Sequence, residues 1–245
     1  SEERLARMRD PETRARVLSS PNSDKAMDLL SPSRVRAITR WDRMYTFGPE
    51  VDYEPSEDRC VVNIAARSNR TAEEVAYDYL TEGLDHFLYC PVSNYVSGDL
   101  ETTREMFLDS GTLCGLSDGG AHVGSVVDAS MPTYLLTHWA RDRSRGPKLP
   151  IETVVKAQTS ETANFFGMTD RGRLTPGLRA DVNLIDHDGL RIHAPHLVHD
   201  LPAGGKRLLQ GVDGYVATMV AGETVFENGE HTGALPGKLV RAGQG

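Results

Sequence analysis

The sequence has no long apolar run. Its longest stretch with few charges, about residues 123–137, still contains an aspartate, a proline and several polar residues. A membrane-spanning helix needs about 20 consecutive, mostly apolar residues. No charged-then-apolar leader opens the chain at Ser1, so we expect no membrane association and no secretory signal.

The sequence also has no excess of basic residues. Its formal net charge is −8, and lysine and arginine are scattered among acidic residues. Nucleic-acid binding needs clustered cations that neutralise phosphates, so we expect no nucleic-acid partner. The 39% apolar and 25% charged residues instead fit a soluble globular protein. A length of 245 residues suits one large domain or a domain and a half.

Cysteines and paired histidines are sparse. Cys60, Cys90 and Cys114 are odd in number and lack CxxC spacing. They predict buried, reduced thiols in a cytoplasmic protein rather than a redox or metal role. No His-x-His pair occurs anywhere in the chain.

Helices are predicted near the beginning of the chain. Residues 2–18 have the pattern of a charged amphipathic helix interrupted near Pro11. Residues 71–82 predict a cleaner helix, because Thr71 is a suitable N-cap and Glu74 stands three residues later, as a capping box requires.

The middle of the chain alternates helices with short strands. Residues 86–90 and 112–116 are short apolar runs typical of buried strands, and residues 99–109 predict a helix between them. Residues 131–141 and 151–166 predict two further helices. The order helix, strand, helix, strand indicates an α/β fold with a parallel sheet or barrel.

After about Pro176 the pattern changes to strands. Residues 181–186 and 215–220 alternate apolar and polar side chains, and residues 224–227 predict a returning strand that ends at an Asn-Gly turn. These features indicate a β-rich tail with a hairpin. Residues 202–211 predict a glycine-containing loop.

The octapeptide Gly-Leu-Ser-Asp-Gly-Gly-Ala-His at residues 115–122 follows the strand predicted at 112–116. It contains the G-x-S-x-G pattern of a nucleophile elbow, with Ser117 as the exposed serine. Asp181 and His193 would supply the acid and histidine in the required order. However, an elbow leads straight into a helix, and the glycines and Pro132 that follow are poor helix formers.

A metal-site carboxylate is the competing interpretation of the same segment. Asp118 would stand at a strand end, where parallel α/β folds place their ligand sites. The following Gly119 and Gly120 would let backbone and substrate approach closely. Such a carboxylate can bind a divalent metal and move a proton from water to a leaving amine. A simple Asp-Gly turn would leave the same pattern.

A resemblance favours the metal interpretation. The segments GLSDGGAHVG and DASMPTYLLTHWARDR resemble the last barrel strand and loop of the amidohydrolase superfamily, in the branch of N-acyl-D-amino-acid deacylases (D-aminoacylases). The resemblance covers nearly the whole chain and is weakest before Tyr53. It continues through residues 93–95, 98–99, 159–164, 170–186 and 199–241.

The family implies a (β/α)₈ barrel with a small β-sandwich, so residues 1–176 would be the C-terminal part of the barrel and residues 177–245 the sandwich strands. It implies zinc as cofactor and an N-acyl-D-amino acid as substrate. Asp118 matches the aspartate that acts as general base and acid and as a metal ligand. The residues expected to contact the substrate are Ser117, Gly119, Gly120, His122, Asn94 and Tyr95.

The sequence departs from the family in its metal ligands. The family needs a His-x-His pair, a bridging Lys, Glu or Cys and two further histidines, but only Asp118 carries over. A complete barrel takes about 250 residues, more than residues 1–176 offer. We therefore expect an incomplete enzyme that is inactive alone, whose N-terminal half supplies the other ligands. Its exposed strand edges would favour a homo-oligomer. A non-catalytic scaffold and a serine hydrolase using Ser117 are the alternatives.

Three further features have ordinary structural interpretations. His193, His196 and His199 predict surface-loop histidines, because Pro195 prevents a helix that would align them. Arg141 and Arg143 could bind a substrate carboxylate, but a solvated helix end with a structural ion pair is the preferred interpretation. The acidic residues 50–58 predict a solvated loop.

Overall fold

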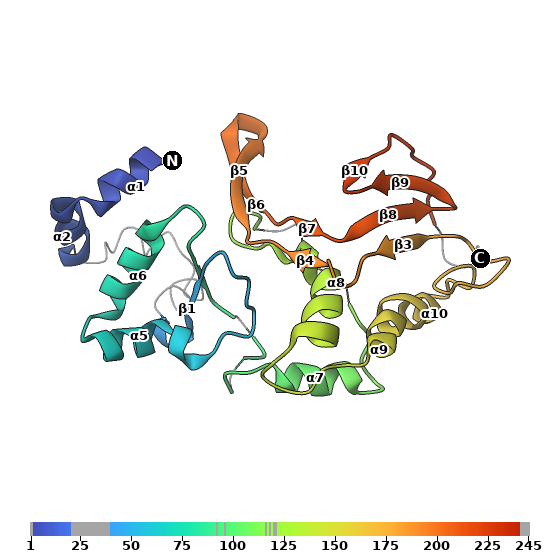
Figure 1. Cartoon of the computed structure of the whole chain (residues 1–245), viewed down its shortest axis with the longest axis horizontal. Coiled ribbons are helices and arrows are strands. Elements are labelled where there is room, and N and C mark those ends of the chain that lie inside the picture. The colour runs from blue at the N-terminus through green and yellow to red at the C-terminus, as the bar shows by residue number, and fades with distance from the viewer. Residues whose placement is uncertain are drawn as a thin grey trace. The chain divides into compact units, whose positions relative to one another are not determined.

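The computed structural model describes most of the chain. The described residues are 2–20, 40–91, 93–95, 97–115, 117, 119 and 122–240. The chain divides into two compact units, Ser1–Arg104 and Glu105–Gly245, and helix α7 (Glu101–Leu108) crosses the division. Helices dominate the first unit, whereas the second combines helices with antiparallel strands (Figure 1). The chain is thus a mixed α/β protein.

The first unit begins with two short helices. α1 (Glu2–Arg9) and α2 (Pro11–Ser19) meet at Asp10, whose carboxylate accepts a hydrogen bond from the backbone N–H of Thr13 at 2.8 Å. Proline suits the first turn of a helix, because its missing N–H would have no intrahelical partner there. The predicted helix with a break near Pro11 is confirmed.

Arginines attach these two helices to α6 (Ala72–Glu82). Arg14 donates two hydrogen bonds to the Asp78 carboxylate, at 2.6 and 3.0 Å, and Arg9 donates two to carbonyls in the last turn of α6, at 2.6 Å each. Carbonyls of a last helical turn lack intrahelical partners, so the Arg9 bonds cap the helix. Of the described side chains of α1 and α2, only Leu5 is buried, so the attachment is mainly polar.

Helix α6 begins with the predicted capping box. The Glu74 N–H donates to the Thr71 hydroxyl at 3.2 Å, and the Thr71 N–H donates to the Glu74 carboxylate at 2.8 Å. The helix ends at Glu82, and Gly83 is extended rather than left-handed. A Cβ on Gly83 would lie 2.6 Å from the Asp85 carboxylate, so a larger residue here would require the Asp85 side chain to move.

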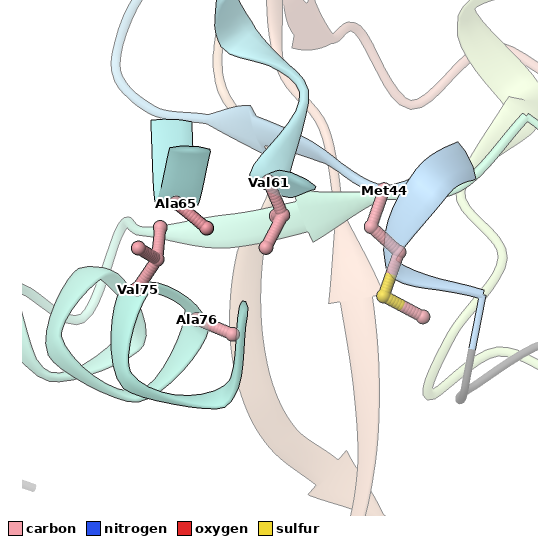
Figure 2. Close-up of a cluster of buried hydrophobic side chains, with 5 residues drawn as sticks. All are labelled: Met44, Val61, Ala65, Val75 and Ala76. Atoms are coloured by element: carbon pink, nitrogen blue, oxygen red, sulfur yellow. The ribbon is translucent and has the colours of Figure 1, made fainter. Parts of the chain in front are cut away.

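The core of the first unit lies between α6, α5 (Val61–Ser68) and the segment before β1 (Tyr45–Phe47). Residues one helical turn apart on α5 face α6, and a methionine closes the cluster from the other side (Figure 2). The five buried side chains are Met44, Val61, Ala65, Val75 and Ala76. Burial of one valine side chain stabilises a fold by roughly 1.5–3 kcal/mol, so this small cluster is the main apolar anchor of α5 and α6.

The strand predicted at residues 86–90 is present as β2 (Phe87–Tyr89). It pairs antiparallel with β1, with Tyr45 opposite Tyr89. Its side chains are half-buried rather than buried, because β1 and β2 form a two-stranded sheet. The parallel pairing that the order of elements indicated is therefore wrong for this strand.

Two helical segments follow α7 in the second unit, and both were predicted. They include π-helical stretches, near which threonine hydroxyls donate to carbonyls of the preceding turn, as Thr137 does to Thr133 at 3.1 Å. Among the described helices, none combines the length and apolar character that crossing a membrane requires. The first segment comprises η3 (Asp128–Ser130), α8 (Met131–Tyr134) and η4 (Leu135–Asp142), and the second comprises α9 (Ile151–Lys156), η5 (Ala157–Glu161) and α10 (Thr162–Phe165).

The second unit ends in antiparallel sheets, which confirms the predicted β-rich tail. The largest has the strand order β10-β9-β8-β3, and its turn at Asn228-Gly229 was predicted. The domain boundary predicted at 176/177 falls between α10 and β3 and stays a prediction. The strands of the large sheet are β3 (Val182–Ile185), β8 (Tyr215–Val220), β9 (Glu223–Glu227) and β10 (Glu230–His231), and the others are β4 (Arg191–Ile192), β5 (His196–Leu201), β6 (Gly205–Leu209) and β7 (Val212–Asp213).

Two predictions about this unit are wrong. Residues 112–115 form no strand, because no described strand lies beside them to complete a ladder. Residues 202–211 are mostly not a loop, because β6 pairs with β5 after a tight turn. Ala203 in that turn is left-handed (φ 58°), a conformation that sequence patterns do not predict for alanine. Every strand pair in the described part of the chain is antiparallel.

Candidate functional site

The motif at residues 115–122 is partly described. Ser117 is half-buried and Gly119 is exposed. The catalytic candidate Asp118 and its neighbour Gly120 lie outside the described residues. The structure therefore shows the segments on either side of the candidate carboxylate, residues 112–115 and 122–127, which we call the frame of the motif.

Three elements of the second unit hold this frame. The Thr162 hydroxyl of α10 donates to the Cys114 carbonyl at 3.5 Å, and the Leu208 N–H of β6 donates to the Val123 carbonyl at 2.7 Å. A Cβ on Gly119 would lie 3.1 Å from a side chain of η3. A helix and a strand thus fix the two ends of the segment, and glycine permits the close approach between them.

His122 forms a turn directly after the motif. Its φ is +50°, which is uncommon for a residue with a Cβ. Its carbonyl accepts hydrogen bonds from the backbone N–H groups of Ser125, at 2.8 Å, and Val126, at 3.0 Å. The residue is exposed. The backbone of His122 therefore ends the motif, and the predicted role of its side chain toward substrate stays a prediction.

Asn94 and Tyr95 belong to the first unit. Asn94 is exposed and left-handed (φ 60°). Tyr95 is buried, its hydroxyl donates to the Pro55 carbonyl at 2.6 Å, and its ring meets that of Tyr45 edge to face at 5.7 Å. The Tyr95 hydroxyl thus anchors its own segment, and its ring lines a hollow of about 490 Å³.

The acidic stretch 50–58 is not simply a solvated loop, which corrects the prediction. Glu54 is 1% exposed, and its carboxylate accepts a hydrogen bond from the Leu100 N–H at 2.8 Å. Burial of a carboxylate is costly unless hydrogen bonds compensate it. Glu54 and Pro55 therefore tie this stretch to residues 95–100, a role that the acidic composition concealed.

The three tail histidines do not form a metal site. His196 and His199 lie on β5, not in the predicted loop. The His193 Nε2 lies 2.8 Å from the Asp213 carboxylate. In the described part of the chain, no group of three or more His, Cys, Asp or Glu side chains is placed to hold a metal ion.

The geometry does not support a nucleophile elbow at Ser117. Among the described residues around the motif, none before it forms a strand, and the next described helix begins at Asp128. The acid and histidine are also engaged elsewhere, because Asp181 accepts hydrogen bonds from Arg179 and His193 pairs with Asp213. The arrangement that a serine hydrolase requires is therefore missing from the described residues.

Arg141 has the structural role preferred from the sequence. Its guanidinium donates to the Asp142 carboxylate at 2.7 and 2.8 Å, and to the Leu190 carbonyl at 2.8 Å. Arg143 is 2% exposed and lies over the Trp139 ring at 4.7 Å. The described contacts of both arginines thus attach η4 to its surroundings, and the burial of Arg143 corrects the prediction of a solvated helix end.

The three cysteines are unpaired thiols, as predicted. Cys60 is buried, as predicted, whereas Cys90 and Cys114 are only half-buried, which corrects the prediction for these two. Burial raises the pKa of the Cys90 and Cys114 thiols. Because the thiolate is the reactive form, neither is an activated nucleophile.

The chain is similar to known proteins over parts of its length. It is 34% identical over 145 residues to an uncharacterised protein of Mycobacterium bovis and to one of Mycobacterium tuberculosis, a match that covers 53% of this chain and 23% of each relative. The chain thus spans less than a quarter of the length of these curated relatives.

Solved structures of D-aminoacylase are also similar. A crystal structure of D-aminoacylase matches with a TM-score of 0.40 and 23% identity, over 78% of this chain and 36% of that one. A second, concerned with the binuclear metal center of D-aminoacylase, matches with a TM-score of 0.39 and 22% identity over the same shares.

The model of the amidohydrolase family matches residues 89–226, more than half of the chain. This range contains the whole motif at residues 115–122, both helical segments of the second unit and most of its strands. The chain belongs to the amidohydrolase family.

Proposed function

We propose that this chain is part of a metal-dependent hydrolase that cleaves the amide bond of an N-acyl-D-amino acid, with Asp118 as its catalytic carboxylate. The observation that carries the proposal is the amidohydrolase family match, because it includes every residue of the motif. The substrate class follows from the resemblance of residues 115–143 to N-acyl-D-amino-acid deacylases.

In the proposed reaction Asp118 moves one proton. Its carboxylate accepts a proton from water while the water oxygen adds to the acyl carbonyl. The C–N bond then breaks, and Asp118 returns the proton to the departing amine. The proposed substrate contacts are Ser117, Gly119, Gly120, His122, Asn94 and Tyr95.

Zinc is the proposed metal, and it would polarise the acyl carbonyl when bound. The described residues do not fit a complete centre, because they hold no group of three or more possible ligands. We therefore derive no step through the metal. We propose that Asp118 is one ligand and that another part of a longer cytoplasmic protein, of which this chain is the C-terminal portion, supplies the rest.

The architecture proposed for that protein is a (β/α)₈ barrel with a β-sandwich beside it. Residues 1–176 would be the last part of the barrel, and residues 177–245 would be sandwich strands. The change from helices to strands between Phe165 and Val182 supports this division.

The test compares this chain with the longer protein. Release of free amino acid from N-acetyl-D-methionine and N-acetyl-L-methionine is measured before chelation, after chelation and after zinc is restored. We expect the longer protein to prefer the D substrate, to lose activity with the chelator and to regain it with zinc, and the chain alone to show little or no turnover.

Other outcomes would replace the proposal. Chelator-resistant turnover together with fluorophosphonate labelling of Ser117 would establish a serine hydrolase. An inactive longer protein that the reagent does not label would instead indicate a non-catalytic scaffold.

A further inference from the structure

The hollow in the first unit does not include the proposed catalytic carboxylate Asp118, and Tyr95 is the one proposed substrate contact that lines it. Its volume of about 490 Å³ lies within the roughly 300–1,000 Å³ of small-molecule sites. A buried cluster of Tyr45, Cys60 and Tyr95 lines it, with Val62 packed against the cluster. Its charged lining residues are Arg40, Asp42, Arg43 and Glu57.

The backbone before β1 directs Arg43 toward this hollow. Met44 is extended, with φ −111° and ψ 132°, and its side chain lies in the core cluster shown in Figure 2. Successive side chains of an extended backbone point to opposite sides. Arg43 and Tyr45 therefore both face away from that core, and both line the hollow.

Two of the four charges in the lining neutralise each other. Arg40 donates to both carboxylate oxygens of Asp42, at 2.9 and 2.7 Å. Within the described part of the chain, the side chains of Arg43 and Glu57 make no hydrogen bond or ion pair. The hollow thus presents one guanidinium and one carboxylate that no described side chain binds by a hydrogen bond or ion pair, beside two tyrosines, and Asp42 interacts with Arg43 only electrostatically.

We propose that this hollow binds a free α-amino acid, with the ligand carboxylate on Arg43, the ligand ammonium on Glu57 and the ligand side chain over Tyr45 and Tyr95. A guanidinium suits a carboxylate, because it can donate two parallel hydrogen bonds. This site goes beyond the proposed function, because it does not involve Asp118 and holds whether or not the chain contributes to hydrolysis.

The first test is calorimetric titration of the purified chain in a buffer with a chelator. The probes are D-methionine, N-acetyl-D-methionine, which lacks the ammonium, and D-methioninamide, which lacks the carboxylate. We expect D-methionine to bind at least about fivefold more tightly than either analogue, because only it engages both charges. No binding of D-methionine, or equal binding of all three, would overturn the proposal.

The second test assigns the charges to residues. Arg43→Gln should weaken D-methionine and N-acetyl-D-methionine by at least about fivefold and leave D-methioninamide unchanged. Glu57→Gln should weaken D-methionine and D-methioninamide and leave N-acetyl-D-methionine unchanged. Arg4→Gln and Glu12→Gln, on α1 and α2, are matched controls that should bind like the wild type.

Thermal unfolding shows whether each variant folds. If Arg43→Gln does not fold, the exposed Glu57 still decides the question, because its side chain makes no hydrogen bond or ion pair with the described residues. Wild-type binding by folded Arg43→Gln and Glu57→Gln variants refutes the site. Because the chelator removes metal, such a result would leave the proposed hydrolysis standing.

Discussion

Among the single residues that the structure describes, Gly214 has a strict backbone requirement. Its φ is +100°, and a Cβ there would lie 2.6 Å from the Leu190 Cα and 3.0 Å from the Asp186 carbonyl. These neighbours are backbone atoms, which cannot rotate away as a side chain can. The Gly214 carbonyl also accepts a hydrogen bond from the Asp186 N–H at 2.8 Å, so a shift of Gly214 would break a contact at the end of β3.

Gly214→Ala should lower the free energy of unfolding by at least about 2 kcal/mol, because backbone strain and steric overlap add. Gly229→Ala is the matched control. Gly229 is also left-handed (φ 84°) but has open space around it, so its loss should be about 1 kcal/mol. Urea denaturation measures both free energies of unfolding. Equal losses in the two variants would show that the backbone around Gly214 shifts enough to remove the steric overlap.

Asp78 gives the first unit a pH dependence. Hydrogen bonds from Arg14 and the nearby Arg70 hold the pKa of the Asp78 carboxyl below its ordinary value of 3.8. A group whose pKa is lower in the folded state contributes stability above its unfolded pKa, and this contribution disappears as the pH falls through its folded pKa. We therefore expect α1 and α2 to loosen from α6 only below about pH 3.8.

Hydrogen exchange of the amides in α1 and α2 measures this loosening. Asp78→Asn should accelerate their exchange at neutral pH, and added salt should do so moderately in the wild type, because the pair is about one-third exposed. Glu50→Gln removes a charge from the same unit and should leave the exchange unchanged. Equal protection in Asp78→Asn would show that apolar contacts hold the two helices.

Among the elements, helices were predicted from local sequence patterns more accurately than strands were. The break at Pro11 and the capping box at Thr71 depend on residues at most a few positions apart, so the sequence predicted them. Strands depend on distant partners: residues 112–115 lack one, and β6 pairs with β5 through a turn whose left-handed residue is an alanine. The antiparallel pairing of β1 with β2 joins segments about 40 residues apart, so no local sequence pattern could predict it.

Thr71→Ala tests the local contribution directly. It removes the hydroxyl that accepts the Glu74 N–H and should destabilise the first unit by about 1 kcal/mol. Thr102→Ala in α7, where the side chain is exposed, should change stability little. The midpoint of thermal unfolding distinguishes the two variants. An unchanged midpoint for Thr71→Ala would mean that water accepts the Glu74 N–H hydrogen bond in place of the Thr71 hydroxyl.

In the whole molecule, apolar side chains of the second unit remain exposed. Phe165, Phe166 and Leu174 are 70%, 58% and 84% exposed. Clustered apolar surface favours association, so we expect the isolated chain to self-associate or to be poorly soluble. Gel filtration should show a population larger than a monomer, reduced in a Phe165→Ser/Phe166→Ser variant. A clean monomer at high concentration would contradict this expectation.

The candidate site was predicted in part. The sequence identified the motif because glycines and an aspartate in this order match a known family. It did not identify Arg43 or Glu57, because the hollow that they line forms from segments about 50 residues apart. It also missed the burial of Glu54, since acidic composition alone favours a solvated loop.

The most direct test of the proposed activity is kcat for N-acetyl-D-methionine hydrolysis by the longer protein carrying Asp118→Asn. Asp188→Asn, at an exposed aspartate of the second unit, is the matched control. Loss of a general acid–base group costs about 100- to 10,000-fold in rate. We predict a loss of that size for a folded Asp118→Asn variant and activity near that of the wild type for Asp188→Asn. Near-normal turnover by Asp118→Asn would contradict the central claim.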